Sequence, residues 1–418
     1  MASWRETTLG EVCDEVNGVI QTGPFGSQLH QSDYSEVGIP IVMPKDIVEG
    51  RIAADTVARV SAEHVERLSR HKLSAGDIVY GRRGDIGRQA LIRPEQAGWM
   101  CGTGCLRLSL GKAVLDPLFL HYYLKQDDVV SWITNQAVGA TMPNLNTGIL
   151  RSVPVRLPPL PIQRRIAGIL SAYDELIENS QRRIKILETI ARALYREWFV
   201  YFRFPGHESV PRVPSSLGEI PQGWEVRRVP DCVHINPRVA VPRDGEKPFV
   251  PMGCLSNDSM LITDIESRIG NSGAKFQNGD TLFARITPCL ENGKTGFVQF
   301  LPDADAVACG STEFIVFRSR SFTPEFVYCL ARSDEFRGVA IKSMSGATGR
   351  QRVQEQCFDD FQITQPPRAL LDQFSSIVAP SFRIIYKLHL QITNLRRTRD
   401  LLLPRLLSGQ IDMEAMPL

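Results

Sequence analysis

One stretch of the chain, residues 158–200, constrains the fold more than any other. After Pro161 it contains no further proline, and its one glycine, Gly168, comes early. Apolar residues recur at steps of three and four, the period of a long helix with an apolar seam. The seam residues are Ile162, Ile166, Ile169, Tyr173, Ile177, Ile184, Leu187, Ala191, Leu194 and Trp198. Such a helix would be roughly 60 Å long and needs a partner along its seam.

A second stretch, residues 370–410, has the same character. Its seam consists of Leu371, Phe374, Val378, Ser381, Ile385, Leu388, Ile392, Leu395, Leu402 and Leu406. Pro380 within it predicts a kink, because proline removes a helical donor and clashes with the preceding turn. Prolines lie at the start of the first stretch, within 158–161, and just before the second, at 366–367, where a helix start tolerates them. Two long helices with similar beginnings suggest a chain that is built twice.

The composition is that of a globular protein with two or three domains. The chain has 418 residues, 43% hydrophobic and 22% charged, with a net charge of +2. A nucleic-acid-binding role would therefore need a local basic surface. Residues 382–407 contain one acidic residue, Asp400, and an excess of basic residues: Arg383, Lys387, Arg396, Arg397, Arg399 and Arg405. A solvated helix face would explain this bias equally well.

The cysteines and the N-terminus indicate a reducing, aqueous location. Nine cysteines include no Cys-x-x-Cys pair, and the closest two are Cys101 and Cys105. This pattern favours reduced thiols over a disulfide framework or a structural zinc site. The N-terminus is polar, and no run approaches 18 apolar residues. We therefore expect a cytoplasmic protein without a signal peptide or membrane span.

Before the first long helix, the chain is typical of a mixed α/β globule. Short apolar runs at 39–42, 73–80 and 88–92 alternate with glycine-containing turns and predict strands. Residues 116–133 have helical periodicity, and Asp116 stands just before Pro117 as a candidate N-cap. These features predict an α+β protein.

The same features return in the same order after a proline-rich linker. Gly76 and Asp77 before a strand are matched by Gly279 and Asp280, an offset of 203, and the Cys-Gly pairs at 101–102 and 309–310 are offset by 208. Several weak matches at nearly one offset indicate an internal repeat. The predicted segments are a globule at 1–157, a long helix at 158–200, a linker at 201–217, a second globule at 218–365 and a second helix at 366–411.

This order, together with several local motifs, resembles the specificity (S) subunit of type I restriction–modification systems over essentially the whole chain. The most specific pieces are residues 158–166, Trp198 with Phe199, and the segments 23–29, 139–145 and 401–411. The resemblance implies two target-recognition domains, each reading one half of a bipartite double-stranded DNA site. The second globule departs from the family loop: residues 349–352 (Gly-Arg-Gln-Arg) stand where the first has residues 142–145 (Met-Pro-Asn-Leu).

The resemblance also implies a division of labour with other subunits. The two helices would pair antiparallel, set the gap between the half-sites and dock two modification (methyltransferase) subunits. Restriction (nuclease-translocase) subunits would join for cleavage. The chain itself would carry no cofactor, and S-adenosylmethionine, ATP and Mg²⁺ would be bound by the partner subunits.

Candidate DNA contacts are polar residues in the loops of each globule. Arginine can bond guanine bidentately, and asparagine or glutamine can bond adenine in the same way. In the first globule they are Gln28, Lys45, Arg82, Arg83, Arg88 and Asn144. In the second they are Lys275, Arg285, Lys294, Arg350, Gln351 and Arg352. An ordinary solvated turn is the competing interpretation for each.

Candidate residues for helix pairing or partner docking lie along the two seams. They are Ile166, Ile169, Leu187, Leu194, Trp198, Phe199, Ile385, Leu388, Ile392 and Leu395. Most are expected to pack on the other helix. For Trp198 and Phe199 an interface role and a local core role both remain open.

No catalytic motif stands out. Residues 293–295 (Gly-Lys-Thr) lack the preceding glycine of a P-loop, since Pro288 occupies its place, and they precede a predicted strand. Residues 236–239 (Asn-Pro-Arg-Val) lack the second proline and the aromatic residue of an amino-methyltransferase motif. A DNA-reading scaffold without its own active site is the preferred interpretation. A nuclease or methyltransferase with a cryptic site, and a purely structural adaptor, are the alternatives.

Overall fold

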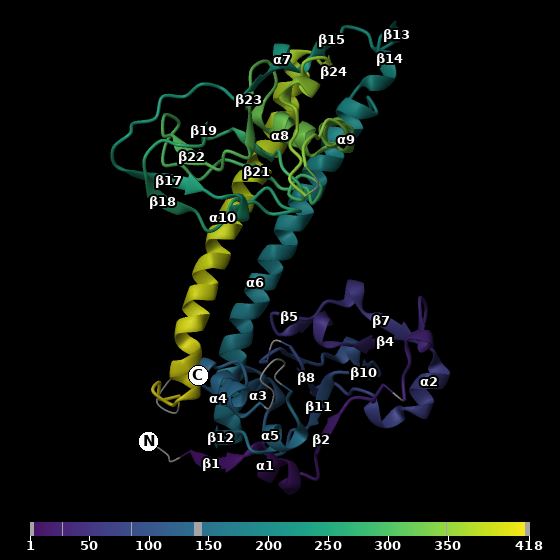
Figure 1. The fold of residues 1–418 in the computed structure, drawn as a ribbon, viewed down its shortest axis with the longest axis vertical. Helices are drawn as coiled ribbons and strands as arrows, with labels where there is room; N and C mark the ends of the chain where they lie inside the picture. The colour runs from purple at the N-terminus through teal and green to yellow at the C-terminus, as the bar shows by residue number, and fades with distance from the viewer. Residues whose placement is uncertain (1–3, 27, 85, 138–143, 348, 414–418) are drawn as a thin grey trace. The chain divides into compact units, whose positions relative to one another are not determined.

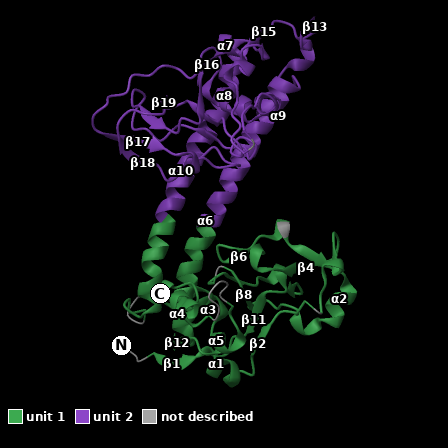
Figure 2. Ribbon diagram, viewed as in Figure 1, with its two compact units in different colours: residues 1–176, 395–418 green, residues 177–394 purple. Residues whose placement is uncertain are grey.

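A computed structural model describes residues 4–413 apart from 27, 85, 138–143 and 348. The chain forms two compact units (Figure 2): unit 1 contains residues 1–176 and 395–418, and unit 2 contains residues 177–394. The boundary falls inside both long helices, so each unit consists of one globule and a part of each helix. The fold is α+β, as predicted.

Unit 1 is built from short strands in paired sheets. Its strands are β1 (Arg5–Thr8), β2 (Val19–Thr22), β3 (Tyr34–Ser35), β4 (Ile39–Val42), β5 (Ile47–Val48), β6 (Arg51–Ile52), β7 (Ala58–Val60), β8 (Ile78–Gly81), β9 (Gln89–Leu91), β10 (Met100–Cys101), β11 (Cys105–Ser109) and β12 (Pro154–Leu157). Two four-stranded sheets have the orders β10-β4-β7-β3 and β2-β11-β8-β9, while β1 pairs with β12 and β5 with β6. Its short helices are α1 (Leu9–Glu15), α2 (Ala62–Arg67), α3 (Pro117–Tyr123), α4 (Asp127–Gln136) and α5 (Thr147–Arg151).

Unit 2 repeats this plan. Its strands are β13 (Arg212–Ser215), β14 (Gly218–Pro221), β15 (Glu225–Arg228), β16 (Val233–Ile235), β17 (Glu246–Val250), β18 (Glu266–Ile269), β19 (Ala274–Phe276), β20 (Thr281–Ala284), β21 (Thr295–Phe297), β22 (Ala308–Gly310), β23 (Phe314–Ser319) and β24 (Gln362–Gln365). The four-stranded sheets have the orders β16-β23-β20-β21 and β18-β17-β22-β19. The helices of its globule are α7 (Val229–Cys232), α8 (Pro324–Arg332) and α9 (Asp334–Lys342).

The repeat seen in the sequence is a repeat of strand pairing. β1 pairs with β12 as β15 pairs with β24, and the parallel pair β4 with β10 has its counterpart in β17 with β22. The matched Gly-Asp motifs also behave alike. Asp77 bonds Arg107 at 2.7 Å and Asp280 bonds Arg318 at 2.6 Å, each arginine lying on the neighbouring strand. Both carboxylates are buried, so each motif fixes a turn and a strand pair together.

The predicted long helices are α6 (Leu160–Tyr195), which continues as a short π-helical segment to Val200, and α10 (Arg368–Leu407). α10 runs without interruption through Pro380. Within each unit the two helices lie side by side (Figure 1): Asp174 contacts Arg399 in unit 1, and Phe199 contacts Phe374 in unit 2. Asp174, in the first half of α6, meets the C-terminal part of α10, whereas Phe199, after the end of α6, meets the N-terminal part of α10. The pairing is therefore antiparallel.

One predicted helix is wrong. Residues 116–133 form two helices, α3 and α4, rather than one. Asp116 does cap α3, accepting hydrogen bonds from the backbone N–H groups of Leu118 and Phe119. The break comes at Gln126, whose backbone is extended, and Asp127 and Asp128 begin a new first turn where carboxylates favour a helix start. Residues 324–339 divide in the same way into α8 and α9.

The helix seams are buried within the units, although the predicted face of α6 is rotated slightly. In unit 1, Ile166 of α6 lies with Leu406 and Leu407 of α10 and with Leu120 of the globule in one buried cluster. In unit 2, Ile385, Leu388 and Ile392 are buried. Four of the predicted pairing residues are only half-buried: Ile169, Leu187, Leu194 and Leu395.

Trp198 and Phe199 belong to the core of unit 2. The Phe199 ring lies 4.9 Å from that of Phe326 on α8 and 5.0 Å from that of Phe374 on α10. The Trp198 ring lies 6.1 Å from the Phe374 ring. Of the two roles that the sequence left open, the structure places both residues in the local core.

Candidate nucleic-acid interface

Loops from distant parts of unit 1 meet at the turn between β10 and β11. The backbone N–H of Gly23, after β2, donates to the carbonyl of Cys105 at 2.9 Å, and that of Arg82, after β8, donates to Gly104 at 2.8 Å. Leu145 donates in turn to the carbonyl of Arg82 at 2.9 Å. Pro44 lies against the same turn, since a Cβ on Gly104 would be 3.3 Å from it. We call these segments (23–29, 43–46, 81–84, 102–105 and 144–146) the loop end of unit 1.

Three predicted contacts are brought together here from two distant segments. The Arg82 side chain donates through Nε to Asn144 Oδ1 and to the Leu145 carbonyl, both at 3.0 Å. Arg83 and Asn144 form a backbone bridge, and the Arg83 side chain is exposed. Arg82 therefore holds the loops together, whereas the Arg83 side chain is left exposed at the same place. Of the family-like loop at 139–145, residues 139–143 lie outside the described part of the chain.

The remaining predicted residues of unit 1 divide between loop closure and exposure. Gln28 closes its own loop, because its Oε1 accepts from the backbone of Phe25 at 3.1 Å. Lys45 is exposed on the short helical turn after β4 and has no hydrogen bond or ion pair with any described residue. Arg88 is exposed, and its backbone carbonyl accepts from Gly81 at 2.7 Å where β9 joins β8.

We call the corresponding segments of unit 2 (236–239, 285–286, 311–313 and 350–353) the loop end of unit 2, and they use the same backbone connections. Arg285 donates to the carbonyl of Glu313 at 2.9 Å and accepts from Val353 at 2.8 Å, as Arg82 does with Gly104 and Leu145. Ile286 and Arg352 form the backbone bridge that Arg83 and Asn144 form in unit 1. Arg352 therefore occupies the place of Asn144, one residue away from the correspondence expected from the sequence. Strand pairing fixes this register, whereas a loop alignment cannot detect it.

Several predicted cations of unit 2 are already engaged. Arg352 binds both carboxylate oxygens of Glu313, with distances from 2.6 to 3.0 Å, and this hydrogen bonding lowers the pKa of Glu313. Arg285 Nη1 bonds Glu355 at 2.7 Å. Lys294 Nζ donates to the Met252 carbonyl at 3.0 Å, so its first role is to hold a turn.

The other predicted residues of unit 2 are closer to solvent. Arg350 is exposed, and Lys275 lies half-buried on β19. Gln351 is anchored through its backbone N–H, which donates to Thr287 Oγ1 at 3.1 Å.

The prediction missed Arg238. This exposed residue lies in the loop that follows β16, as the loop of residues 23–29 follows β2 in unit 1. Residues 236–239 were considered only as an incomplete methyltransferase motif. Their position directly after the first strand of the repeated sheet was the signal that could have identified them as part of a loop end.

The described residues contain no cluster of three or more His, Cys, Asp or Glu side chains suited to a metal ion. Lys294 and Thr295 lead into strand β21 rather than into a helix, which is not the context of a P-loop. Within the same described part, no helix is long and apolar enough to cross a membrane. What the geometry offers is two matched sets of loops with exposed basic and amide side chains.

Comparison with known proteins agrees with this geometry. Residues 1–189 match the family model of the type I restriction modification DNA specificity domain. The type I restriction enzyme MjaIX specificity subunit of Methanocaldococcus jannaschii is 25% identical over 392 residues, covering 90% of this chain and 88% of that protein. The HindI specificity subunit of Haemophilus influenzae is 18% identical over 98% of this chain and all (100%) of its own length.

A solved structure shares the fold. The crystal structure of a type I restriction–modification S subunit from M. genitalium superimposes with a TM-score of 0.58 at 14% identity, covering 97% of this chain and 96% of that one. The class is thus that of two-unit α+β proteins whose paired helices carry duplicated globules. The chain belongs to the specificity (S) subunits of type I restriction–modification systems. It is accordingly their DNA specificity subunit, a non-catalytic part of the complex.

Proposed function

We propose that each unit reads one half of a bipartite site in double-stranded DNA, through its own loop end. The observation that carries this proposal is the duplicated loop connection: Arg82 and Arg285 hold matched loops, and Asn144 and Arg352 stand at matched positions. Different side chains on the same scaffold are what two different half-sites require, because base edges are discriminated by side-chain chemistry. Contacts by the predicted loop residues of both units are part of this proposal.

We propose that the segments at 1–157 and 218–365 act as recognition domains and that the helices at 158–200 and 366–411 set the unread gap. Antiparallel pairing fixes the register of two helices, and a fixed register sets a half-site spacing as dimer geometry does in other DNA-binding proteins. Inserting one turn into both helices should lengthen the gap by about one or two base pairs, since a turn adds about 5.4 Å.

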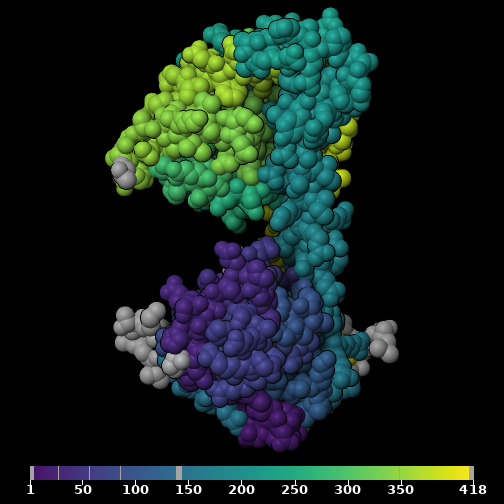
Figure 3. All heavy atoms as spheres, turned by 90° about the vertical axis from the view of Figure 1, so that its right-hand side faces the viewer, coloured from purple at the N-terminus to yellow at the C-terminus, as the bar shows by residue number. Residues whose placement is uncertain are grey.

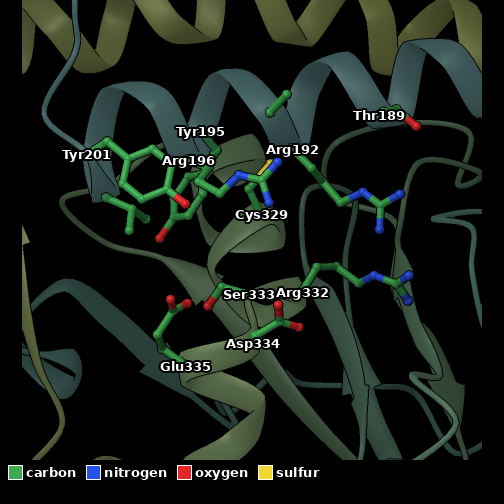
Figure 4. A pocket seen from close by; sticks show the side chains of 12 residues that line it. Thr189, Arg192, Tyr195, Arg196, Tyr201, Cys329, Arg332, Ser333, Asp334 and Glu335 are labelled. Carbon is green, nitrogen blue, oxygen red and sulfur yellow. The ribbon is translucent and has the colours of Figure 1, made fainter.

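We also propose that two modification subunits dock on this chain, that restriction subunits join them, and that these partners carry S-adenosylmethionine, ATP and Mg²⁺. Two matched hollows support two docking sites. The hollow of unit 2, about 360 Å³, lies between α6 and the α8–α9 junction (Figure 4), and includes Arg192, Arg332 and Glu335. The hollow of unit 1, about 670 Å³, lies between α10 and the α3–α4 junction and includes Lys125, Asp128 and Asp400.

Many of the residues that line the two hollows occupy matching positions of the repeat. Lys125 stands where Arg332 does, and the carboxylates of Asp127 and Asp128 correspond to those of Asp334 and Glu335. Close to the hollow of unit 2, the outer face of α6 is uncovered in the space-filling view (Figure 3), and Ile186 and Ile190 are 50% and 55% exposed. One partner copy per hollow matches the proposed stoichiometry, and the copy at unit 2 would also cover this apolar surface. Such a complex would act in the cytoplasm.

The test is methylome sequencing of cells that co-express the chain with its modification subunit. Arg83→Ala should relax base preference in one half of the methylated motif, and Arg350→Ala in the other half. Arg227→Ala serves as a matched control, because Arg227 is exposed in unit 2 and bonds Glu225 on the same strand. Simultaneous changes in both halves, or a motif with a single half, would contradict one reader per unit.

A further inference from the structure

Unit 2 contains a hollow of about 580 Å³ at its loop end. Four separate segments line it: the loop after β16, the start of β19, the end of β20, and the turn that leads into β23. The lining residues are Asn236, Pro237, Arg238, Val239, Gly273, Ala274, Lys275, Arg285, Thr312, Phe314 and Val316. Three are cationic, and none of the lining residues is acidic.

The positive charge of the hollow is not fully compensated. The side chains of Arg238 and Lys275 have no hydrogen bond or ion pair with any described residue. Arg285 shares Glu355 with Asn236, which donates to the same carboxylate at 2.8 Å. The Nε of Arg285 is nevertheless buried without a hydrogen-bond acceptor. A buried donor without an acceptor is uncommon in folded proteins and leaves the Arg285 guanidinium incompletely satisfied by the described residues.

The walls of the hollow are fixed by the sheets. Asn236 has a left-handed backbone, with φ of 49°, and its Oδ1 accepts from the backbone of Val316 at 2.9 Å. Lys275 lies on β19, paired opposite Cys309 of β22. Strand pairing therefore sets the position of Lys275, and Arg238 follows the anchored Asn236 in its loop, which lowers the entropic cost of gathering the two cations around an anion.

The corresponding places in unit 1 lack this arrangement. Lys72 stands where Lys275 does, because its bridge to Met100 matches the pairing of β19 with β22, but it forms an ion pair with Glu66 at 3.0 Å. Arg82, the counterpart of Arg285, is occupied by Asn144 and Leu145. The loop after β2 carries uncharged residues at 23–26, where unit 2 supplies Arg238. The anion-binding character is thus confined to unit 2.

We propose that this hollow binds a backbone phosphate of the DNA held by unit 2, with Arg238 and Lys275 as its principal ligands. The proposal rests on the proposed function, since it assumes that the loop end of unit 2 faces DNA. A guanidinium fork and an ammonium group suit phosphate oxygens, and such contacts position a protein on the duplex without selecting a sequence. Unit 2 would therefore gain affinity from a charge contact that unit 1 does not make.

The test compares DNA binding by the complex with its modification subunits at several salt concentrations. Arg238→Ala with Lys275→Ala should make the slope of log affinity against log salt less steep by about one, the value for one phosphate contact. Affinity at low salt should fall several-fold, and the methylated motif should not change. Arg238→Lys with Lys275→Arg should retain the slope of the natural protein.

A matched control removes the same charge elsewhere in unit 2. Arg227→Ala with Arg228→Ala deletes two exposed arginines whose partners are Glu225 and Asp231, and it should leave the slope unchanged. An unchanged slope in the hollow variant, or relaxed base preference in one half-site, would overturn the phosphate assignment. If the natural complex showed no sequence preference, the proposed function would fail instead, and the slope difference on arbitrary DNA would still decide the phosphate contact.

Discussion

The two units stabilise the same position of the repeat by opposite means. In unit 1, Asp174 of α6 accepts from Tyr122 at 2.7 Å and from Arg399 of α10 at 2.6 Å, joining the globule to both helices. Burial alone would raise the pKa of Asp174, but hydrogen bonds from Arg399 and Tyr122 outweigh it and the pKa is lowered. The repeat places Phe382, Ala191 and Cys329 at these positions in unit 2. There the Phe382 ring packs 5.4 Å from Tyr328 and 5.0 Å from Phe297.

At a second position of the repeat, unit 2 has the buried charged contact and unit 1 does not. In unit 2 the buried Glu188 of α6 accepts from Ser259 Oγ at 2.7 Å and from the Met260 N–H at 2.8 Å, fixing a loop of the globule to the helix. In unit 1 the corresponding Arg396 reaches Glu49 at 3.7 Å in a largely exposed ion pair. The two units therefore share their backbone connections but use different side-chain contacts at matched positions.

The largest effect is expected from the apolar packing of Phe382 in unit 2. Phe382→Ala should destabilise unit 2 by about 3–5 kcal/mol, since it removes a ring that is 2% exposed and leaves a cavity. Calorimetric unfolding of the full chain would measure the loss. A change below about 1 kcal/mol would mean that the ring is not a core element.

Breaking the ion pair of Asp174 with Arg399 in unit 1 should reduce stability slightly less. Arg399→Ala should destabilise unit 1 by about 3 kcal/mol, because it leaves the mostly buried Asp174 carboxylate without its cation. The triple variant Tyr122→Cys, Asp174→Phe and Arg399→Ala copies the solution of unit 2 and should lose less than the single variant. A greater loss in the triple variant would show that the two positions are not interchangeable.

A smaller difference in stability is expected between the contacts that Glu188 and Arg396 make with loops of their globules. Glu188→Ala should cost about 2 kcal/mol, because it leaves the Ser259 hydroxyl and the buried Met260 N–H unpaired. Arg396→Ala should cost about 0.5 kcal/mol or less, as expected for an exposed ion pair. Hydrogen exchange at Met260 reports the first effect directly, and equal costs at the two sites would remove the distinction.

The smallest expected difference between the units is in how their stability changes at acidic pH. Burial lowers the pKa of His121 to about 3 and that of His71 to about 4, both in unit 1. For His121, Lys125, Arg51 and Arg93 lower the pKa further, while Asp174 opposes them. The repeat places Tyr328 and Ala274 at these positions in unit 2.

These histidines stay neutral in the fold and accept protons when it unfolds. Unit 1 should therefore lose stability as the pH falls from about 6.5 towards 4, by about 1 kcal/mol for His121 at pH 5.5. His121→Gln should remove that part of the pH dependence. Hydrogen exchange of core amides at pH 7 and 5.5, corrected for intrinsic rates, would compare the units, and equal sensitivity in both would contradict this assignment.

The repeat shows how far the sequence could be followed. Period, helix caps and matched Gly-Asp motifs are local signals, so both long helices, the α+β class and the α3 cap could be predicted. The division of residues 116–133 into two helices was missed because the apolar period continues across Gln126. Arg82 and Arg285 were selected as DNA contacts for their chemistry, yet the fold uses their side chains to hold loops, which depends on residues 62 to 70 positions away.

The sequence by itself determined the duplicated plan, the two helices and the family, because each depends on short-range periodicity and on order along the chain. The tertiary structure decided which side chains remain free. It neutralised Arg352 with Glu313, left the side chains of Arg238 and Lys275 without a partner among the described residues, and set Asp174 against Arg399. Pairings of this kind join residues that are up to 225 positions apart, and only the packed sheets and helices bring such residues within hydrogen-bonding distance.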